Sequence, residues 1–236
     1  MKKVDDTAEI VERYLADFDQ NRFFLNRENE PVDKRKHWYR VSYPEFIKVF
    51  EDTQNLSGQD KWIPRLACIY SWLARIPTPC FEEQVFRELD GLEMEYKKHK
   101  LWECGTDAWL GGLGTPEQVH HGEFIFQNDK GYPAIIRHFL VAANKLLNNS
   151  NNWASNAPTV TKLLHFTFPN LFPIFDRNIN KRIFGSHHFN YARYHGYVFG
   201  LKFFLEKNPK LVNWLIGQNL NPVRVIEQTV FENRNE

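Results

Sequence analysis

The sequence has few cysteines, no long apolar run and almost no net charge. Its three cysteines, Cys68, Cys80 and Cys104, have no CxxC spacing, so neither a disulfide framework nor a zinc site is predicted. No segment approaches the roughly 20 apolar residues of a membrane span. The first residues, MKKVDDTAEI, carry acids where a secretory signal would need apolar residues. These absences favour a cytoplasmic protein that spans no membrane.

The formal net charge of +1 conceals an uneven distribution along the chain. Residues 81–95 hold six acids and one arginine, whereas residues 158–230 hold nine Lys/Arg and three acids, a formal charge of +6. The small total excludes a wholly basic nucleic-acid coat. The basic second half nevertheless favours an anionic partner.

Helical periodicity dominates, and no stretch alternates apolar and polar residues as a half-buried strand does. Thr7, Ser42 and Pro158 are typical of helix starts, and Glu45 completes a capping box with Ser42. In the last third we expect helices at about 158–168, 176–184, 190–207, 209–217 and 221–232. The chain is therefore predicted to be one all-α, multi-helix domain over residues 1–236. Two helical lobes with a cleft, at 1–125 and 126–236, are an alternative arrangement that a long loop at 102–123 would join.

Two motifs that suggest bound groups are incomplete. LGGLGTPEQ, at 110–118, lacks the GK[ST] ending and the preceding buried strand of a phosphate-binding loop. The histidine pairs at 120–121 and 187–188 are adjacent in sequence, and adjacent side chains on a helix point about 100° apart. We therefore predict no cofactor and no metal.

Asp176 stands between an apolar run, PNLFPIF at 169–175, and a basic segment. The position predicts a helix N-cap, where an Asp side chain stabilises the helix by roughly 1 kcal/mol. The same setting also favours catalysis, because a fixed carboxylate among water-excluding and cationic groups can stabilise a developing cation or activate water. A sugar ring that loses its base develops such a cation, by analogy with glycoside hydrolysis.

Residues 158–162 and 173–182 resemble the end of the helix-hairpin-helix DNA glycosylase motif. In that superfamily a PGVG hairpin precedes a helix that carries a lysine in bifunctional members, and an Asp opens the next helix. The resemblance implies that Asp176 is the catalytic aspartate and Lys162 the Schiff-base lysine. The sequence PTVTK has threonines where the hairpin has glycines.

The resemblance implies an all-α enzyme that excises a base from double-stranded DNA after flipping it out of the helix. The predicted pocket or wedge for the base consists of Trp109, His165, Phe172 and Phe175. The predicted phosphate contacts are Arg177, Lys181, Arg182, Arg193 and Lys202. A monomer is expected, and a role in repair or in defence against modified phage DNA fits equally well.

Two other functions remain open from the sequence. Arg182 and His187 have an Arg-x4-His spacing that resembles the HEPN ribonuclease motif, in which the Arg stabilises a phosphate and the His acts as acid or base. Alternatively, the protein is a non-catalytic helical module that binds DNA or another protein, and Asp176 is only a helix cap.

Overall fold

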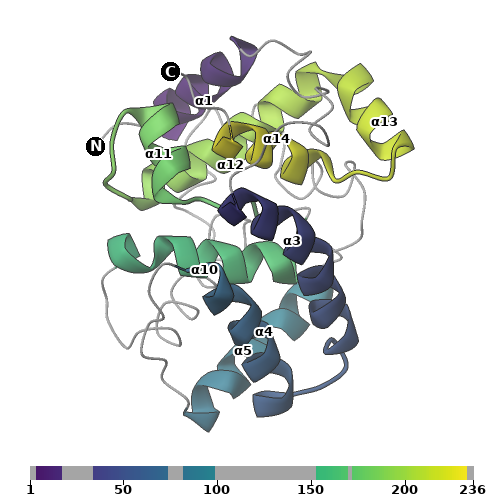
Figure 1. The fold of residues 1–236 in the computed structure, drawn as a ribbon. Coiled ribbons are helices and arrows are strands. Elements are labelled where there is room, and N and C mark those ends of the chain that lie inside the picture. Colours follow the sequence, from purple (N-terminus) through teal and green to yellow (C-terminus); the bar gives the residue numbers. More distant parts are fainter. Residues whose placement is uncertain (1–3, 18–33, 74–81, 99–152, 170–171, 233–236) are drawn as a thin grey trace.

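The computed structural model describes residues 4–17, 34–73, 82–98, 153–169 and 172–232, and every regular element within these ranges is an α-helix (Figure 1). They are α1 (Val4–Ala16), α3 (Lys34–Asp52), α4 (Gly58–Ser71), α5 (Glu83–Lys98), α10 (Trp153–Thr167), α11 (Arg177–Phe184), α12 (Tyr191–Lys207), α13 (Pro209–Gly217) and α14 (Pro222–Glu232). The all-α prediction is confirmed for these residues. The loop expected at 102–123 and the lobe boundary near residue 125 lie outside them.

Helix α10 is central to the arrangement. It contacts α3 and α4, and α4 contacts α5. In Figure 1, α1, α11, α12, α13 and α14 lie on the other side of α10, where α11 contacts α1 and α14, and α13 contacts α12 and α14. None of the described helices combines the length and apolar character needed to cross a membrane.

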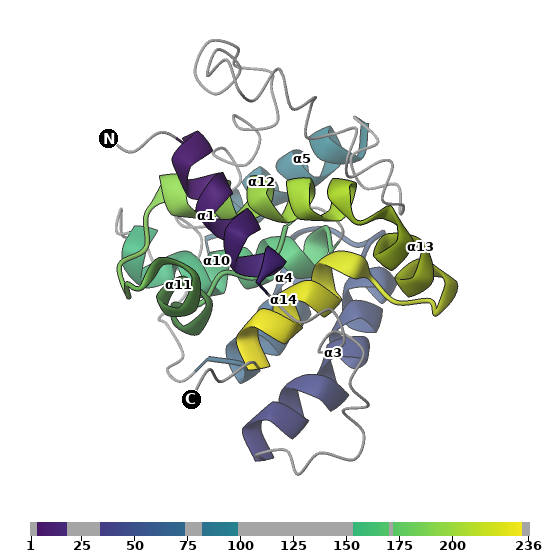
Figure 2. The ribbon, with the colours of Figure 1, turned by 90° about the horizontal axis from the view of Figure 1, so that it is seen from above.

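Helix α1 crosses α12 in close contact (Figure 2). Glycines at 196 and 200 lie one turn apart on α12, and a Cβ at Gly200 would be 2.5 Å from the Cβ of Val11 and 2.7 Å from the carbonyl oxygen of Ala8. Because glycine has no Cβ, the two backbones can approach this closely. At the far end of the contact, Lys207 pairs with Glu12.

Two acids of the segment at 81–95 pair with the neighbouring helix. Lys61 of α4 lies 3.4 Å from Asp90 and 3.2 Å from Glu93, and Arg65 of α4 lies 3.0 Å from Glu93. Lys61, Arg65 and Glu93 are buried, and a buried charge is tolerated only when it is paired and hydrogen-bonded. Asp90 and Glu93 therefore join α5 to α4, whereas Glu82, Glu83 and Glu88 are exposed.

Three expected helix starts lie inside helices. α1 begins at Val4, α3 at Lys34 and α10 at Trp153, so Thr7, Ser42 and Pro158 are interior residues. The hydroxyl of Ser42 donates to the carbonyl of Trp38, one turn earlier, and accepts a hydrogen bond from Trp72 Nε1 at 2.8 Å. Ser42 thus joins α3 to the end of α4 and does not cap α3.

Candidate active site around Asp176

Asp176 is the N-cap residue of α11. Its backbone is extended, with φ −101° and ψ 177°, and its Oδ1 accepts a hydrogen bond from the backbone N–H of Ile179 at 2.8 Å. The helix ends at Gly185, whose φ of 64° lies in the left-handed region that glycine adopts without strain. The predicted cap is confirmed.

The extended segment before Asp176, residues 172–175, is held at both ends by side chains of α10. His165 Nδ1 donates to the carbonyl of Phe172 at 2.8 Å, and the hydroxyl of Thr161 accepts a hydrogen bond from the N–H of Phe175 at 3.1 Å. Both side chains are buried. Because residues four apart share one face of a helix, a single face of α10 fixes both ends of the segment.

Side chains of α12 and α14 hold the middle of the same segment. Tyr194 Oη donates to the carbonyl of Pro173 at 3.3 Å, and Glu227 Oε2 accepts a hydrogen bond from the N–H of Ile174 at 3.0 Å. Buried backbone groups outside regular structure need such side-chain partners, and each residue of the segment has one. Three helices therefore determine where Asp176 lies.

The carboxyl group of Asp176 has a raised pKa. Burial raises it, while the first-turn amides of Ile179 and Asn178 and the positive charges of Lys162 and Arg182 act in the opposite direction. The residue as a whole is half-buried. A fixed carboxylate with increased proton affinity is suited to accept a proton from water.

Lys162, the second predicted catalytic residue, lies on α10. Its side chain is buried, and its Nζ makes a long hydrogen bond of 3.5 Å to the carbonyl of Trp72. The charge of Lys162 lowers the pKa of Asp176, so the two predicted catalytic residues interact electrostatically.

His165 is a buried, neutral histidine. Its Nδ1–H is donated to the carbonyl of Phe172, so its Nε2 accepts the hydrogen bond from Tyr43 Oη at 2.9 Å. Burial, and next the charge of Arg224, lower the pKa of His165 to about 3. At neutral pH, His165 therefore acts as a fixed connector between α3 and the segment that carries Asp176.

Glu227 supplies a second carboxyl group beside this site. It is buried on α14, accepts a hydrogen bond from Arg224, and has Oε2 3.7 Å from His165 Nδ1. Burial raises the pKa of Glu227 to about 7, against the charge of Arg224 and the N–H of Ile174, and the charge of Asp176 raises it further. The charge of Asp176 thus favours the protonated form of Glu227.

The low pKa of His165 predicts how His165→Gln depends on pH. Because the folded-state pKa lies below the ordinary value of 6.5, the stability provided by neutral His165 is fully present above pH 6.5 and is lost as the pH falls toward 3. The substitution should lower the free energy of unfolding, measured by urea denaturation, by about 2 kcal/mol less at pH 5.0 than at pH 7.5. An equal loss at both pH values would contradict the neutral assignment.

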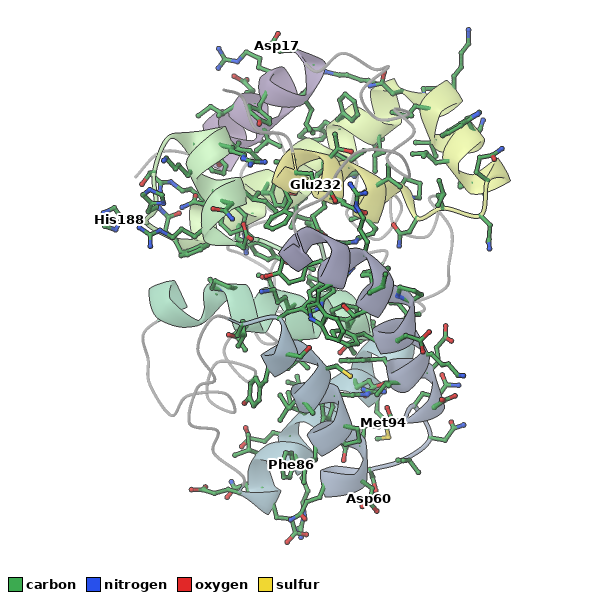
Figure 3. The ribbon with its side chains drawn as sticks, viewed as in Figure 1. Asp17, Asp60, Phe86, Met94, His188 and Glu232 are labelled. Carbon is green, nitrogen blue, oxygen red and sulfur yellow. The ribbon has the colours of Figure 1, made fainter. Side chains whose placement is uncertain are left out.

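Exposed cations lie on α11 and on the turn that follows it. Arg177 and Lys181 are exposed, Arg177 Nε donates to Nδ1 of the exposed His187 at 2.9 Å, and Arg193 is half-buried over the ring of Phe184. His188 is exposed at the outer edge of this region (Figure 3). No acid occurs from residue 177 to residue 205, so the local sequence supplies only positive or neutral side chains.

Two predicted phosphate contacts are corrected by the structure. Lys202 is buried, and its Nζ lies 3.6 Å from Glu206 Oε1. Arg182 donates to the carbonyls of Val230 and Phe231 in the last turn of α14, where a cation is favourable. Lys202 is shielded from solvent, and Arg182 joins α11 to α14. Neither side chain is therefore placed to contact a phosphate.

The predicted base pocket is also corrected. His165, Phe172 and Phe175 are core residues with almost no exposed surface, and a ring without a free face cannot stack on a base. Phe175 packs among Phe184, Phe189, Tyr194 and Tyr197, with ring centroids 5.4–6.2 Å apart. Trp109 lies outside the described residues.

Residues 158–161, which align with the hairpin of the glycosylase motif, lie within the continuous helix α10. The threonines at 159 and 161 are buried, and Thr161 Oγ1 donates to the carbonyl of Ala157 at 2.8 Å. This stretch therefore forms no hairpin for a DNA phosphate. The part of the resemblance that agrees with the structure is an Asp that caps a helix after a lysine-bearing helix.

Glu227 belongs to this site but was not predicted from the sequence. Glu227 stands among apolar residues of one helical face, whose other members include Val223, Ile226 and Val230. A charged residue within such a stripe is a signal of a buried functional or structural acid.

Comparisons of the chain with protein-family models, with curated proteins and with solved structures found no match.

Proposed function

We propose that the protein is a hydrolase that excises a base from DNA by cleaving its N-glycosidic bond, with Asp176 as the catalytic carboxylate. The observation that carries this proposal is the fixation of residues 172–175 by side chains of α10, α12 and α14. A helix cap alone needs only the bond to Ile179. Preorganisation of a charged group is a large source of transition-state stabilisation.

In the proposed reaction, the bond between C1′ and the base nitrogen breaks and its electron pair leaves with the base. The negative charge of Asp176 stabilises the positive charge that develops on the sugar. Asp176 accepts a proton from a water molecule whose oxygen forms the new bond to C1′. The departing base takes up a proton from solvent, and Asp176 later releases its proton to solvent.

Lys162 has an electrostatic role in this proposal. Its charge favours the ionised form of Asp176, and its Nζ is engaged with the carbonyl of Trp72 within the protein. Schiff-base chemistry requires a neutral amine that reaches C1′. The buried position favours hydrolysis without strand cleavage by Lys162.

The ribonuclease alternative has less support. Arg182, which would stabilise the phosphate, donates to two carbonyls of α14, and His187 accepts a hydrogen bond from Arg177. These contacts favour Asp176 over Arg182 and His187 as the chemical centre.

Phosphate binding by the exposed face of α11 predicts a salt effect. Lys181→Gln should weaken DNA binding and reduce the slope of log affinity against log salt by about 0.9, because one phosphate contact is lost. Lys210→Gln is a matched control, since Lys210 is equally exposed but lies on α13, at the opposite end of the molecule in Figure 2. Fluorescence anisotropy across a salt series measures the DNA affinity and the salt slope of each variant. Equal slopes for the two variants would remove α11 from the proposed interface.

The test of the function is base release by the wild-type protein. Duplexes that contain uracil, alkylated bases, oxidised bases or phage-type modified cytosines are incubated with the protein and then treated with alkali, which cleaves at abasic sites. Cleavage of one substrate would identify the base. Absence of abasic sites on every substrate, with folded protein that binds DNA, would favour the non-catalytic module.

A further inference from the structure

Arg177 and His187 form a hydrogen-bonded pair on the surface that α11 shares with the turn after it. The Nε–H of Arg177 donates to Nδ1 of His187 at 2.9 Å, and both residues are exposed. A hydrogen bond between two exposed groups contributes little to stability, because each group would otherwise bond to water. The pair therefore adds little to the fold and is accessible to a ligand.

The turn that carries His187 is fixed by other contacts. It lies at the outer edge of the molecule, where Figure 3 labels His188. The carbonyl of His188 accepts hydrogen bonds from Asn180 Nδ2 at 3.0 Å and from Arg193. The N–H of His188 donates to Ser186 Oγ at 3.1 Å. Because the neighbouring backbone is held in this way, His187 presents its imidazole from a fixed position.

The bond between the two side chains determines which nitrogen of His187 carries the hydrogen. Nδ1 accepts from Arg177, so the neutral ring carries its hydrogen on Nε2. The two ring nitrogens lie on different sides of the imidazole, so the Nε2–H is directed away from Arg177. Within the described ranges, neither this group nor the Nη groups of Arg177 have a partner.

This arrangement of donors suits a row of phosphates. The planar fork of an arginine matches the oxygens of one phosphate, and the Nε2–H of His187 can donate to a neighbouring one. Lys181 lies one turn after Arg177 on the same face of α11 and adds a positive charge. No acid occurs from residue 177 to residue 205. A nucleic-acid strand supplies phosphates in such a row.

We propose that Arg177 and His187 act as one unit that binds two successive phosphates of a DNA strand. This inference rests on the proposed function, which supplies DNA as the ligand. Arg177 donates from its Nη groups to one phosphate, and His187 donates from Nε2 to the next. The hydrogen bond between them orients both side chains, so the two contacts depend on each other. Arg177 directly follows Asp176, so the unit holds the strand next to the proposed catalytic carboxylate.

Two substitutions that conserve the charge at pH 7.5, where imidazole is neutral, test this unit. Arg177→Lys and His187→Ala should each weaken the binding of a labelled duplex by about five- to tenfold in fluorescence anisotropy. The salt slope should not change, because no charge is lost. Arg87→Lys is the matched control, since Arg87 is an exposed arginine that pairs with Glu83 on α5, and this variant should bind as the wild type does.

The double variant tests whether the two residues act together. Each single substitution already breaks the shared hydrogen bond, so the double variant should lose less affinity than the product of the two single losses. Losses that multiply would show independent contacts and refute the unit. Inorganic phosphate at matched ionic strength should not displace the duplex, because it offers only one phosphate. Displacement would overturn the assignment to a strand.

The outcomes separate this inference from the function on which it rests. If the wild type releases a base and both single variants bind DNA with wild-type affinity, the unit is refuted while the function stands. A lower melting temperature together with weaker binding would also refute it, because the bond would then be structural. If both variants bind as expected but the wild type releases no base, the function fails and the DNA contact stands. A wild type that binds no DNA would overturn both.

Discussion

Asp176→Asn is expected to abolish base release while leaving the fold and DNA binding intact. Asparagine is as good an N-cap as aspartate, so its side-chain oxygen can keep the hydrogen bond from Ile179. The variant lacks the negative charge and the proton acceptor, and kcat should fall by about 100-fold or more. Single-turnover assays measure the rate of base release, and thermal melts measure the stability of the fold separately.

Asp176→Ala provides the structural control for this experiment. Alanine removes the cap as well as the charge, which should cost about 1 kcal/mol and lower the melting temperature by roughly 2–4 °C. A purely structural Asp176 would give an active Asn variant and a less stable Ala variant. Full activity of Asp176→Asn would therefore contradict the proposed role of the carboxylate.

Gly200→Ala is expected to destabilise the protein strongly. The added methyl group would lie 2.5 Å from the Cβ of Val11 and 2.7 Å from the carbonyl oxygen of Ala8, distances at which the backbones of α1 and α12 must separate. Overpacking against backbone costs about 3 kcal/mol. The melting temperature should fall by roughly 6–12 °C in a chain of this size.

Gly91→Ala is the matched control, because it makes the same substitution within a helix where space is free. Gly91 lies in α5, is exposed, and a Cβ there would meet nothing within 4 Å. Alanine should therefore stabilise the protein by about 0.5–1 kcal/mol through its higher helix propensity. If both glycine variants raise the melting temperature, the close packing of α1 on α12 is wrong.

The helices of the last third were predictable because residues with special backbone chemistry mark their ends. Asp176 and Asn190 cap α11 and α12, Gly185 ends α11, and Pro209 begins α13. These signals are local, so the sequence alone contains them. The structure places α13 at the predicted bounds and α11, α12 and α14 within one residue of the predicted starts.

The same reasoning failed where proline stood inside a helix. Pro44 and Pro158 were expected near helix starts, yet α3 and α10 begin ten and five residues earlier. A proline loses one backbone hydrogen bond, and local propensity does not reveal when tertiary contacts compensate for that loss. The bond from Trp72 to Ser42 is such a contact, and it joins residues 30 positions apart.

The candidate site was only partly predictable for a related reason. Asp176 and Lys162 lie close in sequence to the motif that identified them, whereas Glu227 reaches the site because α14 packs against α11. Lys202 was expected on the surface because lysine usually is, but α12 is apolar around most of its circumference and buries it. Burial of a charged side chain follows from the surroundings of its helix.

The pairing of α1 with α12 has a consequence for synthesis of the chain. Glu12 and Lys207, which join the two helices, are 195 residues apart, so α1 emerges from the ribosome long before its partner exists. Until α12 follows, the apolar face of α1, with Ala8, Val11 and Leu15, has no site on which to dock. The fold is therefore completed late in translation, and a nascent chain interrupted before α12 would carry an exposed, aggregation-prone helix.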